Sequence, residues 1–182
     1  MYLSKVLEVE FPESQFSVIN AASDSRMKEI INMAGALFSD LQKSPYKDRI
    51  VPVLDSVHGG DVLSKLQSQG VPSENIVIWS NNGIEYYYPK DVLGIIYGEG
   101  GELAIDGDIV ERNGIRYKKA ELADKVVAKL NGLIGYENEF REKFIGTVER
   151  ITGLTNKVRS RERSEPRSEP FVGRAWVEGN HG

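Results

Sequence analysis

The sequence predicts an α/β protein with a mostly parallel sheet flanked by helices, and the order of its elements supports this prediction. Strand-like and helix-like segments alternate over residues 16–79, as they do in parallel sheets with crossover helices. With 182 residues and 40% hydrophobic content, the chain is long enough to bury a core. It contains no cysteine, which excludes disulfide scaffolds, thiolate metal sites and cysteine nucleophiles.

The first predicted strand–helix unit begins with the apolar residues 16–21, FSVINA. Ser23 or Asp24 would cap the helix that follows, because short polar side chains accept hydrogen bonds from unpaired N–H groups at a helix start. Apolar residues spaced by three and four from Met27 to Leu41 mark one buried face. The helix is expected to end before Pro45.

A second strand, a short helix and a third strand follow. Residues 50–54 form the next predicted strand, in which Pro52 indicates the start of the strand or an edge position. Residues 61–69 form a helix that Gly70 ends. The apolar residues 75–79, NIVIW, predict a buried strand.

The second half of the chain predicts helices around a hairpin. Pro89 opens a helix at its first position, where the missing N–H costs little. Residues 102–117 read as a β-hairpin or irregular excursion, with turn signals at Asp106-Gly107 and Asn113-Gly114. Helices are then predicted at about 118–131 and 137–151. We assign residues 1–154 to one domain.

Residues 155–182 differ in character from this domain. They contain a doubled Arg-Ser-Glu-Pro, and their net charge is +2, whereas residues 1–154 carry −6. A segment with so few apolar residues cannot offset the entropy of ordering, so a disordered tail is expected. Phe171 and Trp176 are its two large aromatic residues, and docking on a partner is the alternative for them.

Two acidic residues follow the central predicted strands. Asp55 comes at the end of one strand and Glu85 after the next. The carboxyl ends of strands in open α/β sheets are where ligands bind, and paired carboxylates suit Mg²⁺ or Mn²⁺. Asp55 is equally explained as a turn residue or helix cap. Glu85 is also explained as a surface acid beside the packing tyrosines 86–88.

Lys118 and Lys119 begin the helix after the hairpin. Either could neutralise a phosphate or a transition-state charge, whereas most such lysines are simply solvated.

Several segments together resemble the TOPRIM domain of OLD-family (overcoming lysogenization defect) nucleases, which are often found in phage defence. Residues 16–41 resemble its second strand and helix. VPVLDSVHGG, residues 51–60, is similar to its strand-end Asp-x-Asp motif. IVIWSNNGIEYYYPKDVL, residues 76–93, is similar to the following Ile-Glu segment. YKKAELADKVVAKL, residues 117–130, resembles the Lys-containing helix near the end of that domain.

The resemblance covers about residues 16–151 and implies a TOPRIM-like, Rossmann-like fold. It implies a DNA endonuclease in which Mg²⁺ or Mn²⁺ positions water for attack on a phosphodiester. Asp55 would then be one metal ligand and Glu85 the second. Lys118 or Lys119 would stabilise charge on the phosphate. Nucleic acid as substrate and an ATPase as partner are also implied.

The chain departs from the family pattern in two places. Val57 stands where the second acid of the Asp-x-Asp motif is expected, and the first strand–helix unit with its Glu-Gly motif is missing before residue 16. We therefore expect an incomplete or degenerate relative. Two other functions stay open. One is a non-catalytic interaction module that binds protein or nucleic acid, and the other is a flavodoxin-like nucleotide-binding domain.

A sheet that lacks its first strand exposes an edge, which predicts pairing with a second copy of the chain. No apolar run approaches the roughly 20 residues needed to span a bilayer. The N-terminus lacks the basic start and apolar block of a signal peptide. We therefore expect no membrane partner and a cytoplasmic location.

Overall fold

The structure is a computed structural model. It describes residues 1–21, 23–37, 44, 46–58, 60–131 and 135–153. The helices are α1 (Tyr2–Glu10), α2 (Asp24–Leu37), α3 (Gly60–Ser68), α4 (Lys90–Tyr97), α5 (Lys119–Val127) and α6 (Asn138–Phe140). The strands are β1 (Val53–Leu54), β2 (Val77–Ile78), β3 (Ala104–Asp106), β4 (Ile109–Arg112) and β5 (Ile115–Lys118).

One long helical segment closes the described chain. α6 continues through a π-helical turn, Arg141–Ile145, into α-helical residues 146–153. We call residues 138–153 the C-terminal helix. It agrees with the helix predicted at 137–151.

β1 and β2 form a parallel pair, with Val53 in register with Val77 and Leu54 with Ile78. α3 connects them, so residues 53–78 are a βαβ unit. The predicted mixed α/β character is confirmed. The predicted single, mostly parallel sheet is not seen. Within the described residues there are two sheets, the parallel pair β1–β2 and a larger antiparallel sheet, β3–β4–β5.

Two tight turns produce that antiparallel sheet. Gly107, with φ of 56°, lies in the turn between β3 and β4. Asn113 and Gly114, with φ of 53° and 75°, join β4 to β5. In the second turn, positive φ at both central residues matches the right-handed twist of paired strands and reverses the chain direction tightly. Both predicted turn signals are confirmed, and they make three strands instead of one hairpin.

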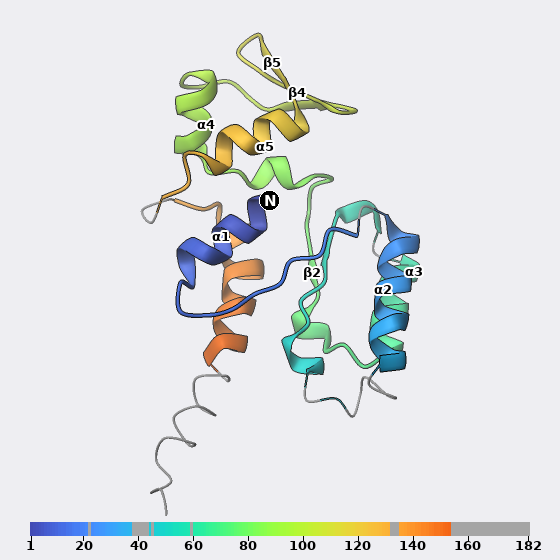
Figure 1. Cartoon of the computed structure of the whole chain (residues 1–182). Coiled ribbons are helices and arrows are strands. Elements are labelled where there is room, and N and C mark those ends of the chain that lie inside the picture. Colours follow the sequence, from blue (N-terminus) through green and yellow to red (C-terminus); the bar gives the residue numbers. More distant parts are fainter. Residues whose placement is uncertain (22, 38–43, 45, 59, 132–134, 154–182) are drawn as a thin grey trace, which may run out of the picture.

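Helices lie on both faces of the parallel pair (Figure 1). On one face, Leu54 packs with Ile31 of α2 and Val62 of α3 in a small core. On the other, Trp79 stacks on Phe140 of the C-terminal helix, with ring centroids 5.6 Å apart. Trp79 and Phe140 belong to a larger core that also includes α1, α4, α5 and β4. The chain therefore buries its apolar residues in two cores.

Local signals in the sequence set several helix ends correctly. Arg26 N donates to Ser23 Oγ at 3.3 Å, so Ser23 caps α2. Gly70, with φ of 84°, follows α3 in the left-handed conformation. Pro89 lies one position earlier than predicted, directly before α4. Residues 38–41, predicted as the end of the helix in the first strand–helix unit, lie outside the described residues.

Two predictions near the N-terminus need correction. Residues 16–21 form no strand and instead cross from α1 to α2 (Figure 1). These residues favour strands by composition, but no described strand pairs with them, and Ile19 remains 68% exposed. α1 was not predicted, although Tyr2, Val6 and Leu7 have helical spacing and are all buried.

None of the helices in the described part of the chain combines the length and hydropathy needed to cross a membrane.

Candidate functional site

The carboxyl ends of β1 and β2 lie side by side because the strands are parallel and in register. Asp55 directly follows β1, and Trp79 and Ser80 directly follow β2. Trp79 N donates to Leu54 O at 2.9 Å, which extends the ladder to this edge. The structure thus places Asp55 at the carboxyl edge of the parallel pair, the position that the sequence predicts for it.

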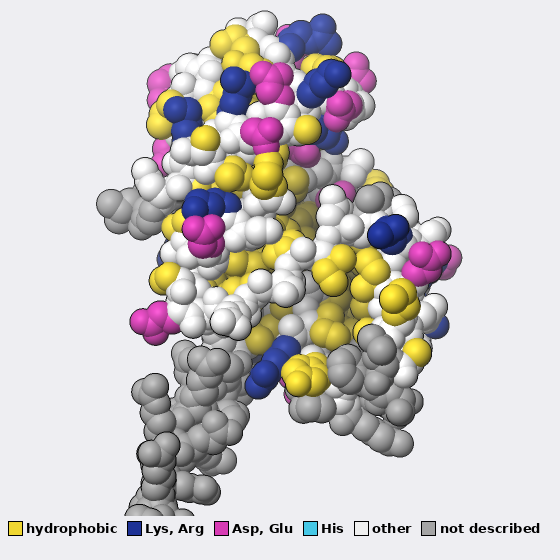
Figure 2. Space-filling view, in the orientation of Figure 1, with side chains coloured by type: hydrophobic (Ala, Val, Ile, Leu, Met, Phe, Trp, Pro, Cys, Tyr) yellow, Lys and Arg dark blue, Asp and Glu magenta, His cyan; other side chains and the backbone are white. Residues whose placement is uncertain are grey.

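A cleft of about 560 Å³ opens beside this edge. Its walls come from α1, residues 16–21 and 23, the stretch from Arg49 to Asp55, and the C-terminal helix. Among the described residues of the lining, Arg49 and Asp55 are the charged side chains, and most of the others are apolar. Figure 2 shows hydrophobic side chains gathered in the hollow between the two halves of the molecule. The cleft therefore separates the two cores and has a mostly apolar lining.

The edge of β1 faces this cleft. Five consecutive residues, 51–55, line it, which a strand does when it presents an edge instead of one face. Val77 N donates to Pro52 O at 2.9 Å, so Pro52 directs its backbone toward β2. Val51 and Val53, on either side of Pro52, direct their backbone N–H and C=O groups away from β2. In the described residues β1 pairs with β2 alone, so this other edge has no strand partner.

The lining also includes the stretch that was predicted to be a strand. Phe16, Val18 and Ile19 line the cleft and are among the exposed large apolar residues of the molecule. Phe16 keeps one side against Phe11, with ring centroids 5.8 Å apart. Apolar side chains held in this way around an open strand edge are typical of an interaction site.

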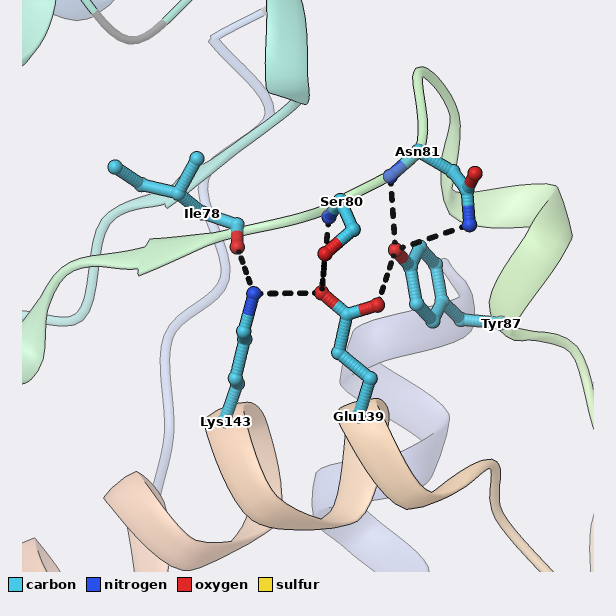
Figure 3. Close-up of polar contacts among 6 residues, drawn as sticks. All are labelled: Ile78, Ser80, Asn81, Tyr87, Glu139 and Lys143. Carbon is cyan, nitrogen blue, oxygen red and sulfur yellow. Dashed lines mark hydrogen bonds and ion pairs between the residues drawn. The ribbon is translucent and has the colours of Figure 1, made fainter.

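Close to Trp79, which lines the cleft, the carboxylate of Glu139 on the C-terminal helix gathers several hydrogen bonds (Figure 3). Its Oε1 accepts bonds from Ser80 N at 2.9 Å, Ser80 Oγ at 2.7 Å and Lys143 Nζ at 2.6 Å. Its Oε2 accepts from the Tyr87 hydroxyl at 2.9 Å. Lys143 Nζ also donates to Ile78 O at 2.8 Å. These contacts join the end of β2 to the C-terminal helix and hold Trp79 between them.

The charge state of this cluster is set by its hydrogen bonds. Burial alone would raise the pKa of Glu139, but the bonds from Lys143, Ser80 and Tyr87 outweigh it and lower the pKa to about 2. Burial raises the pKa of Tyr87, so its hydroxyl stays protonated and donates. A carboxylate this acidic is a poor general base near neutral pH. The cluster therefore holds the structure together and does not transfer protons.

Glu85 lies in a different environment from Asp55. It is in a 3₁₀ turn, Ile84–Tyr87, and is buried with 6% exposure. Lys119 Nζ lies 3.9 Å from Glu85 Oε2, which has no hydrogen-bond partner among the described residues. Gly83, with φ of 130°, permits this packing, because a Cβ there would lie 2.6 Å from the same oxygen. Glu85, which is buried, and Lys119, which is half-buried, thus form an ion pair.

The structure brings together only part of the predicted set. Glu85 and Lys119 pair, whereas Lys118 is exposed as the residue before α5. Asp55 lines the cleft, and Glu85 is not among the residues that line it. Within the described residues, no three His, Cys, Asp or Glu side chains gather in a group that could hold a metal ion. The metal site stays a prediction.

Comparison with known proteins gives no further assignment. No protein-family model, curated protein or solved structure matches this chain.

The sequence reasoning missed Glu139, Ser80 and Lys143. The helical spacing of Glu139 and Lys143, four residues apart, was a usable signal for an ion pair on one helix. Nothing local indicated Ser80 as a partner, because it lies 59 residues away in the sequence. That contact depends on the packing of the C-terminal helix against β2.

The first prediction concerns the Glu139 carboxylate. The pKa of Glu139 is about 2 in the folded protein and 4.5 ordinarily, so its ionised form stabilises the fold above pH 4.5 and this contribution is lost toward pH 2. We expect Glu139→Gln to lower the free energy of unfolding by about 1–3 kcal/mol at neutral pH. The deficit relative to wild type should shrink as the pH falls, which urea denaturation at several pH values measures.

Glu142, an exposed acid on the same helix, supplies the control. Glu142→Gln should leave the free energy of unfolding close to wild type at every pH. A deficit in Glu139→Gln that does not change with pH would contradict the role of the charge.

The second prediction concerns the ion pair of Glu85 and Lys119. Lys119→Met leaves the Glu85 carboxylate buried without its cation, and we expect a loss of about 2 kcal/mol in unfolding free energy. Lys118→Met, at an exposed neighbour, should change it by less than about 0.5 kcal/mol. The double variant Glu85→Gln/Lys119→Met should recover part of the loss, because no charge is then left unpaired. Equal effects of the two single lysine variants in thermal or urea unfolding would argue against the pair.

Proposed function

We propose that this chain is an interaction module whose cleft binds an extended, apolar polypeptide segment carrying a basic residue. The unpaired edge of β1 inside an apolar cleft carries this proposal. An extended segment can add a strand to such an edge, where main-chain hydrogen bonds supply affinity and side-chain pockets supply specificity. The proposal agrees with the interaction module expected as one alternative from the sequence.

The charges at the cleft favour a polypeptide over a nucleic acid. Arg49 lies before β1 and Asp55 directly after it, so the edge carries one charge of each sign. A phosphate backbone is bound by clustered Lys and Arg, and among the described residues the lining has a single basic side chain. Asp55 offers a partner to one Lys or Arg of the bound segment, at the end of an otherwise apolar contact.

Metal-dependent phosphodiester cleavage is the second candidate, because Asp55 occupies the carboxyl end of a parallel strand beside a cleft. In a TOPRIM-like enzyme, Asp55 and Glu85 would hold Mg²⁺ or Mn²⁺, and Lys119 or Lys118 would face the phosphate. Against this candidate, Glu85 already has Lys119 beside it and is buried. A flavodoxin-like nucleotide-binding domain stays a prediction from the sequence alone.

The third prediction tests the proposed peptide site. A displayed library of short linear peptides, selected on the full chain, should yield apolar sequences containing Arg or Lys. Ile19→Asp places a charge on the cleft wall, and we expect it to weaken a selected peptide by about tenfold or more, because an unpaired charge would be desolvated. Fluorescence anisotropy with the labelled peptide measures this loss.

Ile95→Asp is a matched control for this substitution. Ile95 lies on α4 and is 67% exposed, almost the same as Ile19 at 68%, but it does not line the cleft. Affinity should be unchanged in Ile95→Asp. Equal losses in the two variants, or no enrichment of apolar peptides, would contradict the proposed site.

The fourth prediction tests the metal-dependent candidate. If Asp55 is a ligand, calorimetry of the full chain should detect Mn²⁺ binding, and Asp55→Ala should abolish it because a carboxylate oxygen is lost. Asp61→Ala, at an exposed acid at the start of α3, should retain binding. Absence of Mn²⁺ binding by the wild type would remove the metal-dependent candidate and leave the interaction module.

A further inference from the structure

We infer that the cleft is occupied by the chain's own C-terminal segment, residues 171–177, FVGRAWV. This inference rests on the proposed function, since it names the polypeptide that the cleft binds. Residues 154–182 lie outside the described part of the chain, including the tail predicted to be disordered. The argument uses the lining of the cleft, the end of the C-terminal helix and the sequence beyond it.

The described chain ends at the cleft itself. Ile151, in the last described turn of the C-terminal helix, lines the cleft. Residues 154–170 then link the helix to residue 171. A random-coil chain of this length would have a root-mean-square span of about 23 Å. Residues 171–177 are therefore held near the cleft at an effective concentration on the order of 1 mM.

The composition of residues 171–177 suits the lining. Phe171, Val172, Trp176 and Val177 form the main apolar run of the tail, whereas the residues before it are rich in charge, Ser and Pro. The cleft presents apolar side chains from both walls and the unpaired edge of β1. A β-branched and aromatic segment is well suited to pair as a strand.

The charges are also complementary. Arg174 lies in the middle of the apolar run, and Asp55 is the acidic residue of the cleft. Residues 155–182 carry a net charge of +2 and residues 1–154 carry −6. Attraction between the two parts of the chain therefore adds to the apolar contact, and the Asp55 carboxylate is the partner that we assign to Arg174.

This occupancy makes the tail a competitive inhibitor of the cleft. An external segment of similar chemistry must displace residues 171–177, so its apparent affinity is lower in proportion to the fraction of molecules whose cleft residues 171–177 occupy.

The absence of cysteine permits a direct test in the full chain. We would combine Ala175→Cys with Ile19→Cys on the cleft wall, and in a matched control with Ile95→Cys on α4. Under mild oxidation, the pair at 19 and 175 should form an intramolecular disulfide at least about tenfold faster than the pair at 95 and 175. Adding Phe171→Ala and Trp176→Ala should reduce its rate to that of the control. Mass spectrometry under non-reducing conditions distinguishes intramolecular from intermolecular products.

Equal rates for the two cysteine pairs, or a disulfide found only between two chains, would overturn the inference; the second result would assign the cleft to the tail of another copy. Peptide binding separates this failure from failure of the proposed function. If selected peptides bind the cleft while the pair at 19 and 175 forms a disulfide no faster than the pair at 95 and 175, the inference fails and the proposed function stands. When both hold, Phe171→Ala/Trp176→Ala should tighten peptide binding by about threefold or more.

Discussion

The Glu139 carboxylate is the interaction on which the arrangement of the site depends. It accepts bonds from the backbone and side chain of Ser80, from Tyr87 and from Lys143, and thereby ties the end of β2 to the C-terminal helix. A half-buried acid with this many donors is ionised, and removing its charge weakens those hydrogen bonds and the ion pair with Lys143. Trp79, held beside it, joins the parallel pair to the larger core.

This contact also explains why the cleft is open. The C-terminal helix is fixed against β2, and α2 and α3 cover the other face of the pair, so both faces of the two-stranded sheet are filled. The unfilled position is the edge of β1. Residues 16–21, which have the composition to fill it, line the cleft without forming a strand. An edge strand without a partner is usually covered or blocked in proteins, and this need underlies both proposals.

The two predicted acids illustrate how a shared motif can separate in three dimensions. Asp55 lies at the strand end, where the periodicity of the sequence puts it. Glu85 follows β2 by seven residues and turns with the 3₁₀ segment toward α5, where Lys119 pairs with it. Lys119, one of the two lysines predicted to face phosphate, is thus paired with a carboxylate in the fold. Cleft, ion pair and Glu139 cluster form three neighbouring but distinct sets of contacts.

The sequence by itself determined the local elements: the βαβ order, the cap at Ser23, the stop at Gly70 and the turns at Asn113-Gly114. These follow from side-chain stereochemistry and from the spacing of apolar residues within a few positions. The tertiary structure decided which segments pair. Residues 16–21 could form a strand only beside another strand, and none of the described strands pairs with them. The hydrogen bond of Ser80 requires Glu139, which lies 59 residues away in the sequence. Strand pairing and polar contacts between distant segments depend on tertiary packing, so no local pattern could specify them.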